Sequence, residues 1–232
     1  MTKNSNQSAD QKVISILIRL KEITALLQID YLVFGSCGLQ SYQEYFYRLP
    51  NDIDFIVRKT DLETFLEKCK ESDYPILKEQ GRHKVFIDDF PVHLIPETFS
   101  VITKPSLTVL GTVSFTPPMD SPIVNKVQLM NAKESIAIKV MNLEYCLMME
   151  LARKQDTNTF IALLFILNNP RLNVNKFLKL VMEHNFLFSR IKISIDLISK
   201  MLEKYEAISQ PNKNNVSAII ALLTNKLQHR TA

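Results

Sequence analysis

Two aspartates one residue apart, Asp52 and Asp54, are the side chains of this sequence best suited to chemistry. Asp52 directly precedes, and Asp54 lies within, a mainly apolar run from Ile53 to Val57 that predicts a short buried strand. Because side chains alternate along a strand, both carboxylates project from the same face. Two acids so placed repel each other and lose hydration, so they need a compensating cation. Magnesium suits this role, since it takes oxygen ligands from one or two carboxylates together with substrate phosphates.

A Gly-Ser pair lies shortly before these acids. The apolar run Tyr31 to Phe34 predicts another strand, and Gly35 and Ser36 end it. The segment from Leu39 to Tyr47 contains no helix breaker, so we expect a helix there. The sequence therefore predicts a strand, a Gly-Ser turn, a helix and a strand that carries Asp-x-Asp.

Each half of this pattern also has a purely structural interpretation. Asn51 and Asp52 are good turn formers and could simply cap the strand. Ser36 could be an ordinary N-cap of the helix that follows. The chemical interpretation depends on the two halves occurring together.

The combined pattern resembles the nucleotidyltransferase superfamily of the DNA polymerase β type. It is more similar to small bacterial nucleotidyltransferase-like proteins, including the AbiEii/AbiGii toxin group, which have an arginine four residues before the first acid, as Arg48 is here. The similarity extends over residues 30–96 and, more weakly, 135–168. It implies an α+β fold, with a mixed β-sheet and flanking helices followed by a C-terminal helical bundle.

The resemblance also implies roles for individual residues. Asp52 and Asp54 would be catalytic and would bind Mg²⁺, while Gly35, Ser36 and Arg48 would contact the nucleoside triphosphate. The implied activity is transfer of a nucleotidyl group from Mg-NTP to an acceptor hydroxyl.

The third carboxylate of the superfamily has no match here. Its usual setting is an acid between apolar residues on a later strand, and the best match, Val92-His93-Leu94, has a histidine. His93 could act as a general base, because its ordinary pKa of about 6.5 suits that task. Imidazole is a poor ligand for magnesium. Asp88 or Asp89 could supply the missing acid; otherwise they form a solvated turn.

A second group of candidate residues lies in the helical half. Arg153, Lys154 and Asp156 loosely match a basic residue and an aspartate that help the nucleotide site in the toxin-like group. Arg153 and Lys154 could neutralise triphosphate charge, or could form a solvated helix end. A lysine that the group has earlier in this helix would fall near Met148.

Composition excludes several other classes of protein. Only 4 glycines among 232 residues argue against a dinucleotide-binding fingerprint, and a net charge of +4 does not demand a nucleic acid partner. Three cysteines without paired spacing favour a reducing compartment. No apolar run approaches the roughly 20 residues of a membrane span, and no signal peptide is evident. We expect a cytoplasmic protein without membrane association.

The hydrophobic pattern predicts an α/β domain over 1–140 and a helical domain over 141–232. A hairpin of strands 84–87 and 91–95 should turn at Asp88 and Asp89, and another turn is expected at 81–83. The remaining expected strands are 74–78, 107–115, 126–131 and 134–140. The remaining expected helices are 11–27, one that begins at residue 60 or 61, 142–153, 156–168, 174–183, 190–205 and 216–227. A break is expected at 210–212, between the last two helices.

Three functions remain open on the sequence. The first is an active nucleotidyltransferase whose acceptor is RNA, a protein or a small molecule; a toxin role would add an antitoxin partner. The second is a catalytically degenerate binding or regulatory protein of the same fold, which both His93 and the missing lysine near Met148 favour. The third is an α+β interaction protein whose helical half binds a partner.

Overall fold

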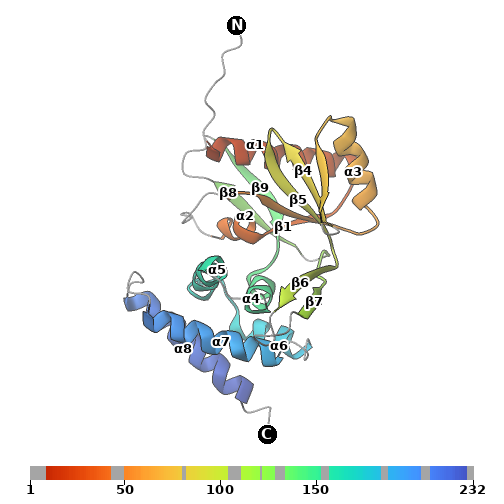
Figure 1. Ribbon diagram of the computed structural model, residues 1–232. Coiled ribbons are helices and arrows are strands. Elements are labelled where there is room, and N and C mark those ends of the chain that lie inside the picture. Colours follow the sequence, from red (N-terminus) through yellow and green to blue (C-terminus); the bar gives the residue numbers. More distant parts are fainter. Residues whose placement is uncertain are drawn as a thin grey trace. The chain divides into compact units, whose positions relative to one another are not determined.

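The computed structural model describes residues 9–42, 50–79, 82–103, 111–120, 122–128, 134–152, 157–183, 188–204 and 210–228. The chain forms two compact units (Figure 1). The first comprises Met1–Phe99 and Thr116–Met141, and the second comprises Ser100–Phe115 and Asn142–Ala232. The division into domains 1–140 and 141–232 remains a proposal.

The first unit is built on a seven-stranded mixed sheet with the strand order β3-β4-β5-β2-β1-β9-β8. The expected α+β class with a mixed sheet is therefore confirmed. Strand β1 pairs with β2 antiparallel and with β9 parallel, and β2 pairs with β5 parallel. The strands of this sheet are β1 (Tyr31–Phe34), β2 (Ile53–Val57), β3 (Ile76–Glu79), β4 (Arg82–Ile87), β5 (Phe90–Pro96), β8 (Ile123–Gln128) and β9 (Ser135–Val140).

Two amphipathic helices pack on the sheet, α1 (Ala9–Leu27) and α3 (Leu62–Glu71). Phe55 of β2 lies in the centre of this core. Its ring stacks on Tyr31 of β1 at 4.9 Å between centroids and lies 5.7 Å from the ring of Phe65 in α3. The alternation of β2 therefore sends Ile53, Phe55 and Val57 into the core and Asp54 to the opposite face.

Helix α2 (Gly35–Gln40) follows β1 without a linker. It begins four residues before the expected helix over 39–47, Ser41 and Tyr42 form a turn, and residues 43–49 lie outside the described part of the chain. Phe34 occupies the N-cap position with no side-chain cap hydrogen bond, so the interpretation of Ser36 as an N-cap is wrong. A Cβ on Gly38 would lie 2.7 Å from the Val33 carbonyl oxygen, so α2 needs glycine there to pack on β1.

Strands β4 and β5 form the expected hairpin. Asp88 and Asp89 have φ values of 51° and 61°, as a two-residue type I′ turn requires. The turn expected at 81–83 is wrong for Arg82 and His83, because both belong to β4; residues 80 and 81 are not described.

The second unit combines helices with the small sheet of β6 (Phe99–Thr103) and β7 (Gly111–Phe115), of which Phe99 falls in the first unit. Asn142 caps α4 as expected, since its Oδ1 accepts a hydrogen bond from Tyr145 N at 2.9 Å. Ser194 Oγ of α7 donates to Leu151 O of α4 at 2.6 Å. The helices are α4 (Leu143–Ala152), α5 (Thr157–Leu167), α6 (Val174–Glu183), α7 (Phe188–Lys204) and α8 (Gln210–Gln228).

Helix α8 begins at Gln210, so the break expected at 210–212 is wrong in its extent. Proline is tolerated in the first turn of a helix, where its missing N–H has no intrahelical acceptor. Within the described ranges, no helix is both long and apolar enough to cross a membrane.

We expect Phe55→Ala to lower the free energy of unfolding of the first unit by about 3–5 kcal/mol, because it leaves a cavity between Tyr31 and Phe65. Urea unfolding followed by circular dichroism would measure the change. Val124→Ala, at a side chain that is 64% exposed, is the control and should cost little. Equal losses in both variants would contradict this account of the core.

Candidate active site

Asp54 lies against the turn that ends β1. The antiparallel register places Phe34 opposite Asp54, so Gly35 meets the carboxylate directly. Gly35 has a φ of 64°, and a Cβ at this position would lie 2.3 Å from Asp54 Oδ2. Glycine is therefore required at this position for two reasons: the backbone conformation is left-handed, and the carboxylate of Asp54 occupies the space of a side chain.

Three of the sequence-derived site residues come together on one face of the sheet. The parallel pairing of β2 and β5 places His93 beside Asp54. His93 Nδ1 lies 3.3 Å from Asp54 Oδ1 and 3.8 Å from Asp52 Oδ2. The side chains of Asp52, Asp54 and His93 are 37%, 24% and 28% exposed, so solvent and solutes can reach them.

The carboxylates raise the pKa of His93 above its ordinary value. The hydrogen bond to Asp54 is the main cause, burial opposes it, and the charges of Asp54 and Asp52 add to it. A nearby lysine, Lys84, acts in the opposite direction. When protonated, the imidazole would supply part of the positive charge that two adjacent carboxylates require.

Cys37 of α2 is buried near the two acids. Burial raises the pKa of its thiol to about 12, and the charges of Asp54 and Asp52 act in the same direction. A thiol that stays protonated is no nucleophile, so Cys37 contributes packing to this region.

Asp88 and Asp89 behave as a solvated turn. Both are exposed, and Asp88 Oδ1 accepts a hydrogen bond from Arg19 Nη1 of α1 at 2.9 Å. This contact ties the hairpin to α1 and gives Asp88 a structural role. It does not support Asp88 as the missing third acid.

The donor set fits a cation that arrives with phosphates. Among the residues described, no group of three or more His, Cys, Asp and Glu side chains is arranged to hold a metal ion. Two converging carboxylates nevertheless match magnesium, which usually completes its coordination with substrate phosphates and water. The imidazole of His93 is a poor third ligand for it. Asp52 and Asp54 thus suit one ion shared with a nucleotide.

Of the other predicted site residues, Ser36 lies partly exposed in the first turn of α2. Arg48, Arg153 and Lys154 lie outside the described residues, as does Asp156.

Lys84 also belongs to this face, although no sequence motif singles it out. The β4–β5 register places Lys84 directly opposite His93, on the same face of the sheet. The sequence contains enough information to pair Lys84 with His93, because a two-residue turn at Asp88 and Asp89 fixes this register. A lone lysine carries no motif, so only the register identifies it.

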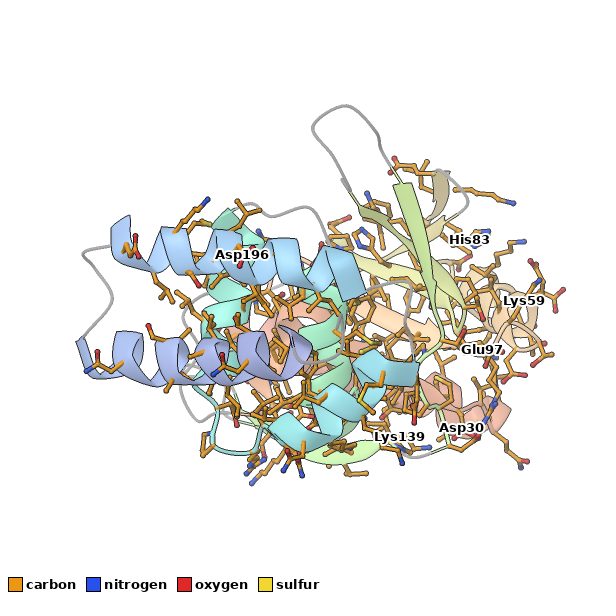
Figure 2. All side chains as sticks on the ribbon, turned by 90° about the horizontal axis from the view of Figure 1, so that it is seen from below. Asp30, Lys59, His83, Glu97, Lys139 and Asp196 are labelled. Carbon is orange, nitrogen blue, oxygen red and sulfur yellow. The ribbon has the colours of Figure 1, made fainter. Side chains whose placement is uncertain are left out.

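A second charged cluster lies at the other end of β1 and β2. Arg58 pairs with Asp30, Glu97 and Asp120, and Lys139 Nζ donates to Asp30 Oδ1 at 2.7 Å. Figure 2 shows Asp30 and Lys139 close together. The hydrogen bond from Lys139 is the main cause of the lowered pKa of Asp30. These pairs connect strand ends, and Arg58 and Lys139 each have an acidic partner, so we regard the cluster as structural.

Comparison with known proteins gives the fold. No protein-family model matches the sequence, and no curated protein does. The solution structure of the antibiotic-resistance factor ANT(2'')-Ia is similar over 79% of this chain and 96% of its own, with 11% identity and a TM-score of 0.52. A crystal structure of ANT(2'')-Ia with adenylyl-2''-tobramycin is similar over 76% of this chain and 99% of its own, with 10% identity and a TM-score of 0.53. The chain has the nucleotidyltransferase fold.

We expect Gly35→Ala to lower the free energy of unfolding by about 1–2 kcal/mol through its left-handed backbone alone. It should also displace Asp54, whose Oδ2 would lie 2.3 Å from the new Cβ. Asp73→Gly, at a φ of 57° just after α3, removes a Cβ from a left-handed position away from Asp54, so its gain in stability measures the backbone effect alone. Chemical denaturation gives the stabilities, and a crystal structure of the variant gives the position of Asp54. An undisturbed Asp54 would contradict the close approach.

The raised pKa of His93 predicts a pH-dependent contribution to stability. A folded-state pKa above the unfolded value means that this contribution is fully present below about pH 6.5 and is lost as the pH rises through the folded-state pKa. The difference in unfolding free energy between wild type and His93→Gln should therefore shrink from pH 5.5 to pH 8.5. Denaturation series at matched pH values measure it, and a difference that grows with pH would refute the assignment.

Proposed function

We propose that this protein is a metal-dependent nucleotidyltransferase that binds Mg-NTP and transfers a nucleotidyl group to an acceptor hydroxyl. The observation that carries the proposal is the convergence of Asp52 and Asp54 beside the Gly35 turn. This convergence occurs in a chain with the nucleotidyltransferase fold. The likeness itself concerns the fold, so the chemistry rests on the side chains.

Asp52 and Asp54 would hold the magnesium ion together with the phosphates of the nucleotide. When bound, the ion neutralises phosphate charge and stabilises the charge that develops on the oxygens around the reacting phosphorus. The backbone of Gly35, which the missing side chain leaves close to Asp54, would contact the phosphates. Ser36 offers a hydroxyl donor next to it. Arg48, Arg153 and Lys154 are further proposed phosphate contacts.

His93 would take the proton of the acceptor hydroxyl. Its Nδ1 faces the two carboxylates, so Nε2 is the nitrogen that would act as the base. The acceptor oxygen forms a bond to the α-phosphorus while the bond from that phosphorus to pyrophosphate breaks. The hydroxyl proton moves to Nε2, and pyrophosphate leaves.

A catalytically degenerate binding or regulatory protein of the same fold is the alternative. The observation that favours it is the imidazole of His93 beside Asp54, in the position proposed for a third carboxylate. Such a protein would still bind a nucleotide through Asp52 and Asp54 but would transfer nothing.

Two finer assignments belong to this proposal. Kinship with the AbiEii/AbiGii toxin group, and with it an antitoxin partner, rests on the spacing of Arg48 from Asp52. A cytoplasmic location is favoured by Cys37, Cys69 and Cys146, which are free buried thiols.

Thermal unfolding with ATP, GTP, CTP or UTP, each with and without magnesium, tests the nucleotide site. One Mg-NTP at 100 times its dissociation constant should add about 2.7 kcal/mol of stability. Magnesium alone should add little, because two carboxylates complete no coordination shell without phosphates. Asp52→Asn/Asp54→Asn should abolish the shift.

Asp88→Asn/Asp89→Asn is the matched control, since it removes two carboxylates from the exposed hairpin turn. It should retain the nucleotide-dependent shift. Absence of a shift with every Mg-NTP would reject both the enzyme and its nucleotide-binding alternative. A shift without release of pyrophosphate or labelling of any acceptor would support the degenerate protein.

A further inference from the structure

Lys84 completes a row of charged side chains across three neighbouring strands. Asp54 of β2 is paired with His93 of β5, and His93 is paired with Lys84 of β4. Directly paired residues share a face of the sheet. Adjacent strands lie about 4.8 Å apart, so the backbone of Lys84 is roughly 10 Å from that of Asp54.

The positive charge of Lys84 is only weakly matched by protein. Its side chain is 27% exposed, and its Nζ lies 3.4 Å from Oε2 of Glu79, a side chain that is 55% exposed. An exposed ion pair of this length holds a lysine loosely.

Toward the hairpin turn, the surface beside Lys84 on this face is apolar. Phe86 lies two residues further along β4 and is paired with Pro91 of β5. Both side chains are partly exposed. Because side chains alternate along a strand, Phe86 projects from the same face as Lys84. A cation next to an aromatic ring and a proline suits a flat ring that carries an anionic group.

The row also has a direction. Gly35 contacts Asp54 from the side of β1, whereas His93 and Lys84 follow on the opposite side, across β5 and β4. In an in-line displacement, the attacking and leaving oxygens lie on opposite sides of the phosphorus. If pyrophosphate leaves toward the Gly35 turn, the acceptor enters over His93 and Lys84.

We infer that the acceptor carries a phosphate group close to its reactive hydroxyl, and that Lys84 binds this phosphate. The inference rests on the proposed function and specifies its acceptor class. A lysine binds phosphate as a point charge and repels a cationic acceptor such as an aminosugar. A phosphorylated sugar and the end of a nucleic acid strand share the required chemistry.

Binding of charge-matched probes tests the inference. The protein is saturated with magnesium and a non-hydrolysable analogue of the NTP that gives the thermal shift. Affinities are then compared for ribose 5-phosphate against ribose, and for a short oligoribonucleotide against its uncharged methylphosphonate analogue. We expect the phosphate member of at least one pair to bind about tenfold or more tightly than its partner. The pair that shows the preference identifies the source of the phosphate.

Substitutions assign the preference to a residue. Lys84→Ala and Lys84→Glu should abolish it, while Lys84→Arg should retain it. Lys78→Ala is the matched control, because Lys78 is paired with His83 and projects from the other face of the same sheet. It should leave the preference unchanged. With wild type and α-labelled NTP, the preferred probe should also accept label more readily than glucosamine.

The outcomes separate this inference from the proposed function. If wild type binds no nucleotide, or if Asp52→Asn/Asp54→Asn still binds it, the proposed function and the inference are rejected together. Normal nucleotide binding without a phosphate preference in either pair overturns the inference alone. A preference that survives Lys84→Ala, or that Lys78→Ala removes equally, also overturns it.

Discussion

The contact between Gly35 and the carboxylate of Asp54 is the constraint on which the rest of the first unit depends. It fixes where β1 must end, because only a residue without a Cβ can turn with a φ of 64° against Asp54. It also determines which side chains of β2 face the core, because Phe55, the neighbour of Asp54, must then point into it. Asp54 is thus held by the Gly35 turn on one side and by His93 on the other.

Charge compensation explains the composition of the proposed site. Two carboxylates so close together are costly unless positive charge is near them. Lys84, and His93 when it is protonated, supply part of that charge from the neighbouring strands, and a cation that arrives with a substrate would supply the rest. A site balanced in this way is stable without ligand and still attracts a metal bound to phosphates.

Features governed by local sequence were predictable. β1, β2 and α6 occur at the expected residues, and the Asp88-Asp89 hairpin sets the pairing that brings Val92-His93-Leu94 into the sheet. The errors arose where tertiary packing overrides propensity. Arg82 and His83 extend β4 because they pair with β3. Helix α2 packs against β1 and β2, and the local sequence does not show where this packing ends the helix.

The strand order has a consequence for how the protein folds during its synthesis. β1 lies between β2 and β9, and Val33 is paired with Val140. The centre of the sheet therefore cannot close until residue 140 has left the ribosome, and long-range pairing of this kind slows folding. β1, β2, β4 and β5 are complete by Pro96 and pair among themselves. The face of the sheet that carries Asp54, His93 and Lys84 can thus assemble in the nascent chain before β9 covers the open edge of β1.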